Sequence, residues 1–296
     1  MNIAISFSGI TGNNGADYVA EFLANATLIS GHNLTMLGSM GGPQAQDIPD
    51  GLDAVIHSSG FALTPELVDR WKKKTKVFVW THNDEIPLFK ERLGRITRSV
   101  NKHFSYTKGH GFGEHVEYLP LAADHTIYFP IKGCKKRYDI SMIGAGHPWR
   151  REFAAKLAKH FPNCKFDFSM SGTHGSINLL YNMTRVVVAP MQDCDQFSPT
   201  AVYGCPCRTF DVPASRAFQI QAQRGGLKDV HAEEFLQETT LPSIRNVDES
   251  IPVWVEAIKK QLDEEKHREI LAHWAYEQIV EKHLYTHRLA TMLEFV

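Results

Sequence analysis

The sequence lacks any strong bias of charge and any long apolar run. Its 296 residues carry 32 Lys and Arg against 33 Asp and Glu, which gives a formal net charge of −1 at pH 7. Such a chain has no overall field that attracts nucleic acid or an anionic membrane, although a local basic groove is compatible with this balance. Because no apolar stretch approaches membrane-spanning length and the chain opens on a strand-like segment, we expect neither a membrane span nor a signal peptide.

Cysteine is scarce and irregularly placed. The chain has 5 cysteines, an odd number without a repeating spacing. Disulfide-stabilised secreted domains use even, regularly spaced sets, so this pattern predicts free thiols in a reducing compartment, the cytoplasm. In Cys205-Pro-Cys207 the two thiols are too close together in sequence for a usual zinc knuckle. We therefore expect no metal site.

What the sequence does have is an ordinary globular composition and enough length for two domains. Hydrophobic residues make up 43% and charged residues 22% of the chain, which suffices to bury two cores of about 150 residues each. Short apolar strands alternate with amphipathic helices in both halves, and this rhythm predicts an α/β fold with parallel sheets. A basic stretch with Pro and Gly at 130–136 is typical of a linker, so we predict domains at 1–130 and 131–296.

Each predicted domain opens with a strand, a glycine-containing turn and a helix, as nucleotide-binding α/β units do. The first opening, however, is Gly9-Ile-Thr-Gly12-Asn-Asn-Gly15, which is not the dinucleotide fingerprint Gly-x-Gly-x-x-Gly. The next strand, Asn33–Leu37, also ends without an acidic residue that could hold a ribose diol. A nicotinamide-dependent dehydrogenase is therefore disfavoured.

The most informative stretch lies between Cys207 and Ile220. It places Arg208, Asp211 and Ser215 at intervals of three and four, so on a helix the three side chains share one face. A guanidinium binds phosphate oxygens, and a carboxylate accepts from sugar hydroxyls, so this face suits a ligand with a phosphate end and a sugar end. The alternative is a surface salt bridge on an ordinary helix.

A second cationic signal follows the turn Gly144-Ala-Gly146. Arg150 and Arg151 lie in the first turn of the predicted helix 149–160, where the helix dipole already favours anions. A diphosphate at that end of the helix would account for two arginines there. Pairing with nearby carboxylates is the alternative.

Polar residues also follow the apolar strand Val77–Trp80 of the first half. The carboxyl ends of parallel strands are where α/β folds place their sites, and here His82 and Asp84 come directly after the strand. A His and an Asp at this edge could act as a general base or orient one. Alternatively, His82 is a hydrogen-bonded loop residue and Asp84 caps the next helix.

Several short motifs follow one another in a fixed order and spacing over roughly 116–293. They are Tyr118-Leu-Pro-Leu-Ala-Ala-Asp124, Tyr138-Asp-Ile-Ser-Met-Ile-Gly144, Arg150/Arg151, Tyr181-Asn182, Ser198-Pro199, Arg208-Thr-Phe-Asp211, Ala217-Phe-Gln-Ile220 and His283-x-Tyr285-x-x-Arg288. In this order and spacing the second half resembles GT-B glycosyltransferases, most closely the branch named after spore-maturation protein B.

The resemblance implies two Rossmann-like domains that face each other, with a C-terminal helix that crosses back to the first. It implies a nucleotide-sugar donor on the second domain, where Asp211 would bind the ribose and the glycine turn and Arg208 would stabilise the diphosphate leaving group. The implied donor-binding residues are Gly144, Gly146, Arg150, Arg151, Ser198, Arg208, Asp211 and Ser215. On the first domain, the loop at Gly12, Asn13 and Asn14 would face a hydroxyl acceptor. No metal and no cofactor beyond the nucleotide sugar, which is a substrate, are implied.

Three alternatives to this interpretation remain. Phage enzymes that glycosylate hydroxymethylated DNA bases share this architecture, and the first half carries a basic patch that could track a phosphate backbone; its members are Lys72–Lys76, Lys90, Arg92, Arg95, Arg98 and Lys102. A metal-dependent GT-A transferase is suggested only by Asp193-Cys-Asp195. An inactive GT-B module that binds a partner is suggested by Asp at 211, where the family usually has Glu, and by Arg216, where it usually has Gly.

Overall fold

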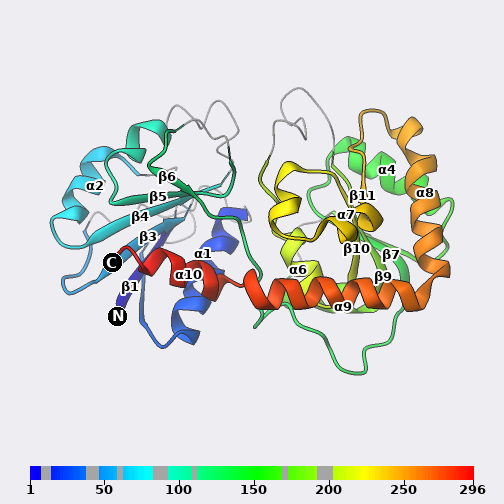
Figure 1. Ribbon diagram of the computed structural model, residues 1–296, viewed down its shortest axis with the longest axis horizontal. Coiled ribbons are helices and arrows are strands. Elements are labelled where there is room, and N and C mark those ends of the chain that lie inside the picture. Colours follow the sequence, from blue (N-terminus) through cyan, green and yellow to red (C-terminus); the bar gives the residue numbers. More distant parts are fainter. Residues whose placement is uncertain are drawn as a thin grey trace. The chain divides into compact units, whose positions relative to one another are not determined.

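The computed structural model describes residues 1–7, 15–37, 47–58, 63–82, 93–108, 112–168, 173–191 and 203–296. The chain divides into two compact units (Figure 1). Unit 1 comprises Met1–Leu121, Tyr203–Cys205 and Leu284–Val296, and unit 2 comprises Ala122–Val202 and Pro206–His283. Each unit is built on one parallel sheet, as the alternating sequence pattern predicts.

The sheet of unit 1 has the order β2-β1-β3-β4-β5-β6. All of its strand pairs are parallel, so the strands end at one common edge. The bounds are β1 (Asn2–Phe7), β2 (Asn33–Leu37), β3 (Ala54–Ser58), β4 (Lys76–Thr81), β5 (Lys102–Ser105) and β6 (Val116–Tyr118). The strand order reverses between β1 and β3, which places a topological switch point at the carboxyl ends of these strands.

Helices cover both faces of this sheet, because successive side chains of a buried strand point to opposite sides. On one face, α2 (Pro65–Lys72) packs Trp71 against a buried cluster that includes Val77 and Val79 of β4. The sequence predicts this helix over 64–74, with Thr64 as its N-cap and Pro65 at its first position. In the structure Thr64 accepts a hydrogen bond from the Leu67 N–H at 3.3 Å, and proline occupies the first turn, so both predictions are confirmed. On the other face lie α1 (Gly15–Ile29) and α10 (Tyr285–Leu293).

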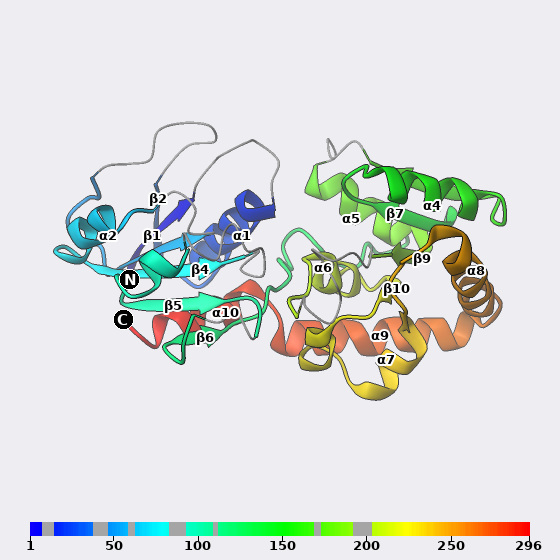
Figure 2. The same ribbon diagram turned by 90° about the horizontal axis from the view of Figure 1, so that it is seen from above.

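The last helix of the chain belongs to unit 1. Tyr285 of α10 packs its ring 5.2 Å from Phe22 of α1 and 5.9 Å from Trp80 of β4. Arg288, which is buried, donates from Nε to the Pro120 carbonyl at 2.7 Å and from Nη2 to the Leu121 carbonyl at 3.0 Å. The expected return of the C-terminal helix to the first domain is confirmed, and Figure 2 shows α10 beside the strands of unit 1.

The sheet of unit 2 has the order β11-β10-β9-β7-β8, again with parallel pairs. Its strands are β7 (Tyr138–Ile143), β8 (Cys164–Asp167), β9 (Thr184–Ala189), β10 (Phe218–Ala222) and β11 (Thr240–Leu241). Its helices are α4 (Pro148–Ala158), α5 (His174–Met183), α6 (Arg208–Ala214), the 3₁₀ turn η1 (Gly225–Asp229), α7 (Glu233–Thr239), α8 (Val247–Asp263) and α9 (Glu265–Lys282). The switch point of this sheet lies between β7 and β9.

The helical tail differs from its prediction. The sequence predicts one helix over 253–295 with a break near Lys282, but the structure has three helices, with a further break at Glu264. Pro252 lies inside α8, which already begins at Val247, where the Asn246 side chain accepts from the Asp248 N–H. The sequence also predicts a last strand at 244–247. This prediction is wrong, because the last strand of the sheet is β11 at Thr240–Leu241 and Val247 already begins α8. Arg268 of α9 accounts for the unexpected break, since its guanidinium donates to the carbonyls of Gln261 and Leu262 at the end of α8.

Candidate functional site

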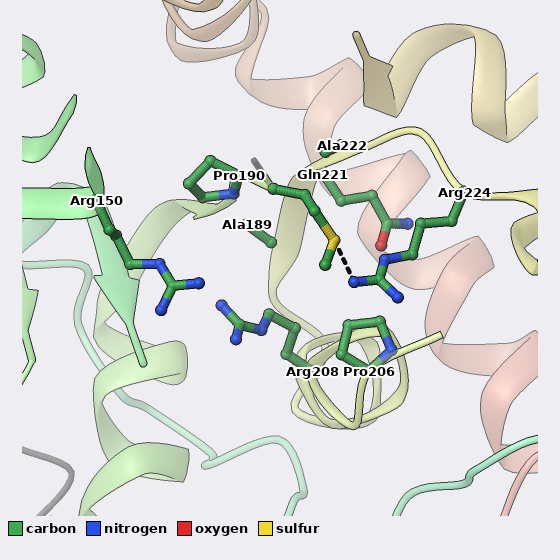
Figure 3. Close-up of a pocket in the computed structure, with 9 residues that line it drawn as sticks. Arg150, Ala189, Pro190, Pro206, Arg208, Gln221, Ala222 and Arg224 are labelled. Atoms are coloured by element: carbon green, nitrogen blue, oxygen red, sulfur yellow. Dashed lines mark hydrogen bonds between the residues drawn. The ribbon is translucent and has the colours of Figure 1, made fainter. Parts of the chain in front are cut away.

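Unit 2 contains a pocket at the carboxyl edge of its sheet, next to the switch point (Figure 3). About 360 Å³ of empty space, part of it open to solvent, lies between the carboxyl ends of β9 and β10 and the start of α6. Its lining residues are Arg150, Ala189, Pro190, Met191, Pro206, Arg208, Gln221, Ala222 and Arg224. This position, outside the carboxyl ends of parallel strands, is where open α/β sheets bind ligands.

Two of the predicted arginines flank the predicted glycine turn. A side chain on Gly144 would place its Cβ 3.0 Å from Nη1 of Arg150 and 3.2 Å from Nη2 of Arg208. Arg150 donates to the Ala145 carbonyl at 2.5 Å, and Arg208 donates to the Ile143 carbonyl at 3.0 Å. Carbonyl oxygens fix both guanidinium groups without neutralising their charges. Figure 3 shows the two groups pointing toward each other across the pocket.

The electrostatics of this pair favour an anion. Arg150 is only 8% exposed, and its pKa is lowered to about 10, first by burial and then by the charge of Arg208. Since a pKa of about 10 lies well above neutral pH, Arg150 remains charged at pH 7. Two like charges held side by side repel each other, and an anion between them removes that cost.

A third guanidinium, which the sequence interpretation missed, reaches the same pocket. Arg224 follows β10 and enters from the side opposite Arg150, where it donates to the Met191 sulfur. Among the described residues that line the pocket there is no Asp or Glu. The available sequence signal was its position two residues beyond the carboxyl end of a buried strand. The pocket therefore presents three guanidinium groups to one small volume, and their hydrogen-bond donors match the oxygens of a phosphate.

Arg151 and Gly146 lie beside this pocket and not in its lining. Arg151 donates from Nε to the Gly146 carbonyl at 3.0 Å, and its guanidinium lies 5.5 Å above the Phe168 ring. A Cβ on Gly146 would come within 2.3 Å of the Arg151 guanidinium, so the glycine gives that side chain its room. Their predicted role in binding the donor stays a prediction.

Asp211 and Ser215 lie deeper along α6. Asp211 is 5% exposed, and its Oδ1 has no hydrogen-bond partner within the described part of the chain. Burial, followed by the charge of Asp124, raises the pKa of this carboxyl well above its usual range, while the charge of Arg208 lowers it. This oxygen is buried and Asp211 is not among the residues that line the pocket, so its predicted role in binding the ribose stays a prediction. Ser215, the C-cap of α6, donates to Asn178 Oδ1 at 2.8 Å and to the Asp211 carbonyl at 2.9 Å.

In unit 1, His82 lies just beyond the carboxyl end of β4. It is 5% exposed, and neither ring nitrogen has a partner among the described residues. Its ring lies 5.2 Å from Trp80 and 6.2 Å from Tyr106. Burial lowers its pKa to about 3, so the imidazole is neutral at pH 7. The other predicted site residues, Asp84, Ser198, Gly12, Asn13 and Asn14, lie outside the described residues, as does Asp193-Cys-Asp195.

The described residues offer neither a metal-binding cluster nor a helix that could span a membrane. They contain no group of three or more His, Cys, Asp or Glu side chains that could hold a metal ion. They also contain no helix of the length and apolar character that a membrane crossing requires. Cys134, Cys164 and Cys207 carry free thiols. Two parallel sheets, one with an arginine-lined pocket at its carboxyl edge, thus define an α/β protein with a cationic pocket.

Comparison with known proteins identifies the family. A model of a family described as glycosyl transferase-like matches residues 131–294, which is more than half of the chain. The chain belongs to this family, and it is a glycosyltransferase. The predicted family is thereby confirmed at this level, whereas membership of the spore-maturation-protein-B branch stays a prediction. No curated protein matches the chain.

Solved structures share the fold over nearly the whole chain. An alpha-glucosyltransferase in complex with UDP and a 13-mer DNA matches with a TM-score of 0.68 and 11% identity, covering 99% of both chains. A glycosyltransferase from Rickettsia africae matches with a TM-score of 0.66 and 12% identity, covering 99% of this chain and 97% of that one. The N-terminal domain of Candida albicans trehalose-6-phosphate phosphatase matches with a TM-score of 0.62 and 10% identity, covering 99% and 96%. At these identities the likeness shows the fold, which is the predicted GT-B fold.

Proposed function

We propose that this enzyme transfers a sugar from a nucleotide-sugar donor to a hydroxyl acceptor, and that the donor diphosphate lies in the pocket of Arg150, Arg208 and Arg224. The observation that carries the proposal is the convergence of three guanidinium groups on one pocket whose described lining has no carboxylate. A diphosphate supplies negative charge and planar pairs of oxygens that match the arginine forks.

The same residues supply the chemistry of sugar transfer. When the bond between the sugar and the diphosphate breaks, negative charge develops on the leaving phosphate oxygen. Hydrogen-bond donors that are already oriented toward this oxygen stabilise the transition state without reorganising. Arg150 and Arg208 are oriented in this way by the carbonyls of Ala145 and Ile143. Because the arginines provide the counter-charge, we expect transfer to continue when divalent metals are removed with a chelator.

Calorimetric titration with UDP, UMP and uridine tests the diphosphate assignment. UDP should bind more tightly than uridine, and substitution of Arg150 or Arg224 by Ala should weaken UDP binding by about tenfold or more, the value of one charge-assisted hydrogen bond. The matched control is Arg216→Ala, which removes an exposed guanidinium of the same unit from outside the pocket lining. Equal affinity for UDP and uridine, or equal losses in all three variants, would refute the assignment.

A second proposal concerns the acceptor, which we take to be a hydroxymethylated base in DNA. It is supported by two solved alpha-glucosyltransferase structures that cover 99–100% of this chain and hold UDP together with a 13-mer DNA containing an HMU base. The test is transfer of labelled sugar to a short duplex with one hydroxymethylated pyrimidine, compared with the same duplex without the hydroxymethyl group. Transfer to the modified duplex alone is expected. Turnover with UDP-glucose but no labelled duplex would point to another hydroxyl acceptor.

A further inference from the structure

The lysines of the basic patch at 72–76 and at 102 lie at the amino edge of the unit 1 sheet, and these residues are called the amino-edge patch below. Lys76 and Lys102 are the first residues of β4 and β5, and Lys72 ends the helix that leads into β4. Ligands of open α/β sheets bind at the carboxyl edge, at the opposite ends of these strands. Position alone therefore argues against the patch as the surface that presents a base for reaction.

Several ammonium groups of the patch are also engaged within the protein. Lys72 donates to the Ser99 carbonyl at 2.8 Å. Lys74 forms an ion pair with Asp50 at 2.8 Å. Lys102 pairs with Glu117 at 2.8 Å and lies 4.2 Å from the centre of the Phe295 ring. These side chains have less to gain from a phosphate than the simple count of positive charges suggests.

A different lysine, Lys108, lies at the carboxyl edge against two tyrosine rings. Lys108 lies three residues beyond the end of β5, and Tyr118 is the last residue of the neighbouring strand β6. The Lys108 ammonium lies 4.7 Å from the centre of the Tyr118 ring and 5.1 Å from that of Tyr203. The two tyrosine rings contact each other edge to face, with centroids 5.7 Å apart. Lys108 itself is exposed.

The two tyrosines restrict a side chain that is otherwise flexible. A free lysine loses much rotamer entropy when it binds a phosphate, and that loss weakens the contact. Here the cation–π contacts already confine the ammonium at the edge of the sheet. An ammonium carries three N–H groups, so a lysine can make more than one contact at the same time.

Aromatic side chains continue along this edge toward the end of β4. The Tyr106 ring packs so closely on Gly204 that a Cβ there would come within 2.3 Å of it. On its other side, Tyr106 lies 6.2 Å from the ring of His82, whose buried nitrogens have no partner in the described ranges. Because Tyr118 and Tyr203 are half-buried and Tyr106 and His82 are buried, we expect these rings to support the edge of the sheet rather than to stack on a base.

We propose that Lys108, held by Tyr118 and Tyr203, binds a backbone phosphate of the DNA acceptor at the carboxyl edge of the unit 1 sheet. This inference rests on the proposed DNA acceptor. Tyr118 and Tyr203 are positioning residues in it, because they act through the lysine. The basic patch at the amino edge is not part of this contact.

The test measures DNA binding by the full chain as a function of salt. The probe is a short duplex with one hydroxymethylated pyrimidine, and the variants are Lys108→Ala, Tyr118→Leu, Tyr118→Phe and Lys73→Ala. Loss of one phosphate contact should reduce the slope of log Kobs against log salt by about 0.9, so Lys108→Ala is expected to show this reduction. Lys73→Ala, an exposed lysine of the amino-edge patch, should leave the slope unchanged.

The tyrosine variants separate positioning from general folding. Tyr118→Leu should weaken DNA binding, whereas Tyr118→Phe, which keeps the aromatic ring over the ammonium, should restore it. UDP affinity, measured on the same preparations, should match wild type in every variant because the donor pocket lies in unit 2.

Three outcomes would overturn the inference. An unchanged slope for Lys108→Ala removes the proposed contact, and an equal reduction for Lys73→Ala returns the role to the amino-edge patch. Wild-type protein that binds UDP but not the duplex overturns the DNA acceptor and Lys108 together and leaves the donor site standing. If the duplex binds and UDP does not, the donor proposal alone fails.

Discussion

The substitution Arg208→Ala tests the donor pocket most directly, because the structure separates what this side chain does for the fold from what it does for the ligand. Within the fold, Arg208 makes one hydrogen bond to the Ile143 carbonyl, worth about 1 kcal/mol net. In a chain of this size that loss lowers Tm by about 2–4 °C.

The expected functional loss is much larger. A charge-assisted hydrogen bond to phosphate contributes about 1.5–3 kcal/mol to donor binding. A hydrogen-bond donor that acts on developing charge stabilises the transition state by about 2.7–4 kcal/mol, which corresponds to about 100–1000-fold in kcat. We therefore expect UDP affinity to fall about tenfold or more and kcat/KM to fall by at least 100-fold. For Arg208→Lys, UDP affinity and kcat/KM should lie between those of wild type and of Arg208→Ala, because lysine keeps the charge but lacks the planar guanidinium.

The assay combines initial rates of sugar transfer, calorimetric UDP titration and thermal unfolding, with Arg216→Ala as the control outside the pocket. Loss of Arg208 also removes the charge that lowers the pKa of Asp211, so the variant should hold this carboxyl protonated to still higher pH. A kcat/KM within about threefold of wild type, together with a Tm loss of many degrees, would refute the reasoning and make Arg208 a structural residue.

Four further predictions follow from the described residues. Gly144→Ala should cost about 1–3 kcal/mol of stability and weaken UDP binding, since Gly144 has φ 145° and an added Cβ would meet the Arg150 guanidinium. An unchanged Tm in this variant would contradict the prediction. Asp211→Asn should raise Tm at pH 8 but not near pH 4, because a carboxyl whose folded pKa is raised destabilises the protein progressively as pH rises above its unfolded value. Arg216→Gly should stabilise by about 0.5–1 kcal/mol, since Arg216 holds φ 52° just beyond the end of α6, and chemical denaturation should detect this. Burial lowers the pKa of both His57 and His82 to about 3, so stability should fall as pH drops from 6.5 toward 3, and a His82→Leu variant that kept the wild-type pH slope would contradict this.

The elements that the sequence predicted well are those specified by local pattern. A continuous apolar run identified β4, and Thr64 with Pro65 identified the start of α2. The breaks in the C-terminal helices were harder to predict, because the end of α8 depends on a guanidinium supplied by the next helix. No periodicity within one segment reports such a contact.

For the site, the sequence by itself determined that a cation, a carboxyl and a hydroxyl would follow one another along α6, and that glycine would stand at the turn after β7. These are properties of neighbours within one element, which helical spacing and backbone freedom specify. Only the tertiary structure decided that Arg224 completes the pocket, because the order of parallel strands, set by their crossovers, brings the ends of β9 and β10 beside the turn after β7. The same reason placed Lys76 and Lys102 at the amino edge of the unit 1 sheet and Lys108 at its carboxyl edge. A sequence shows which residues are charged, but the sheet decides the edge at which they lie.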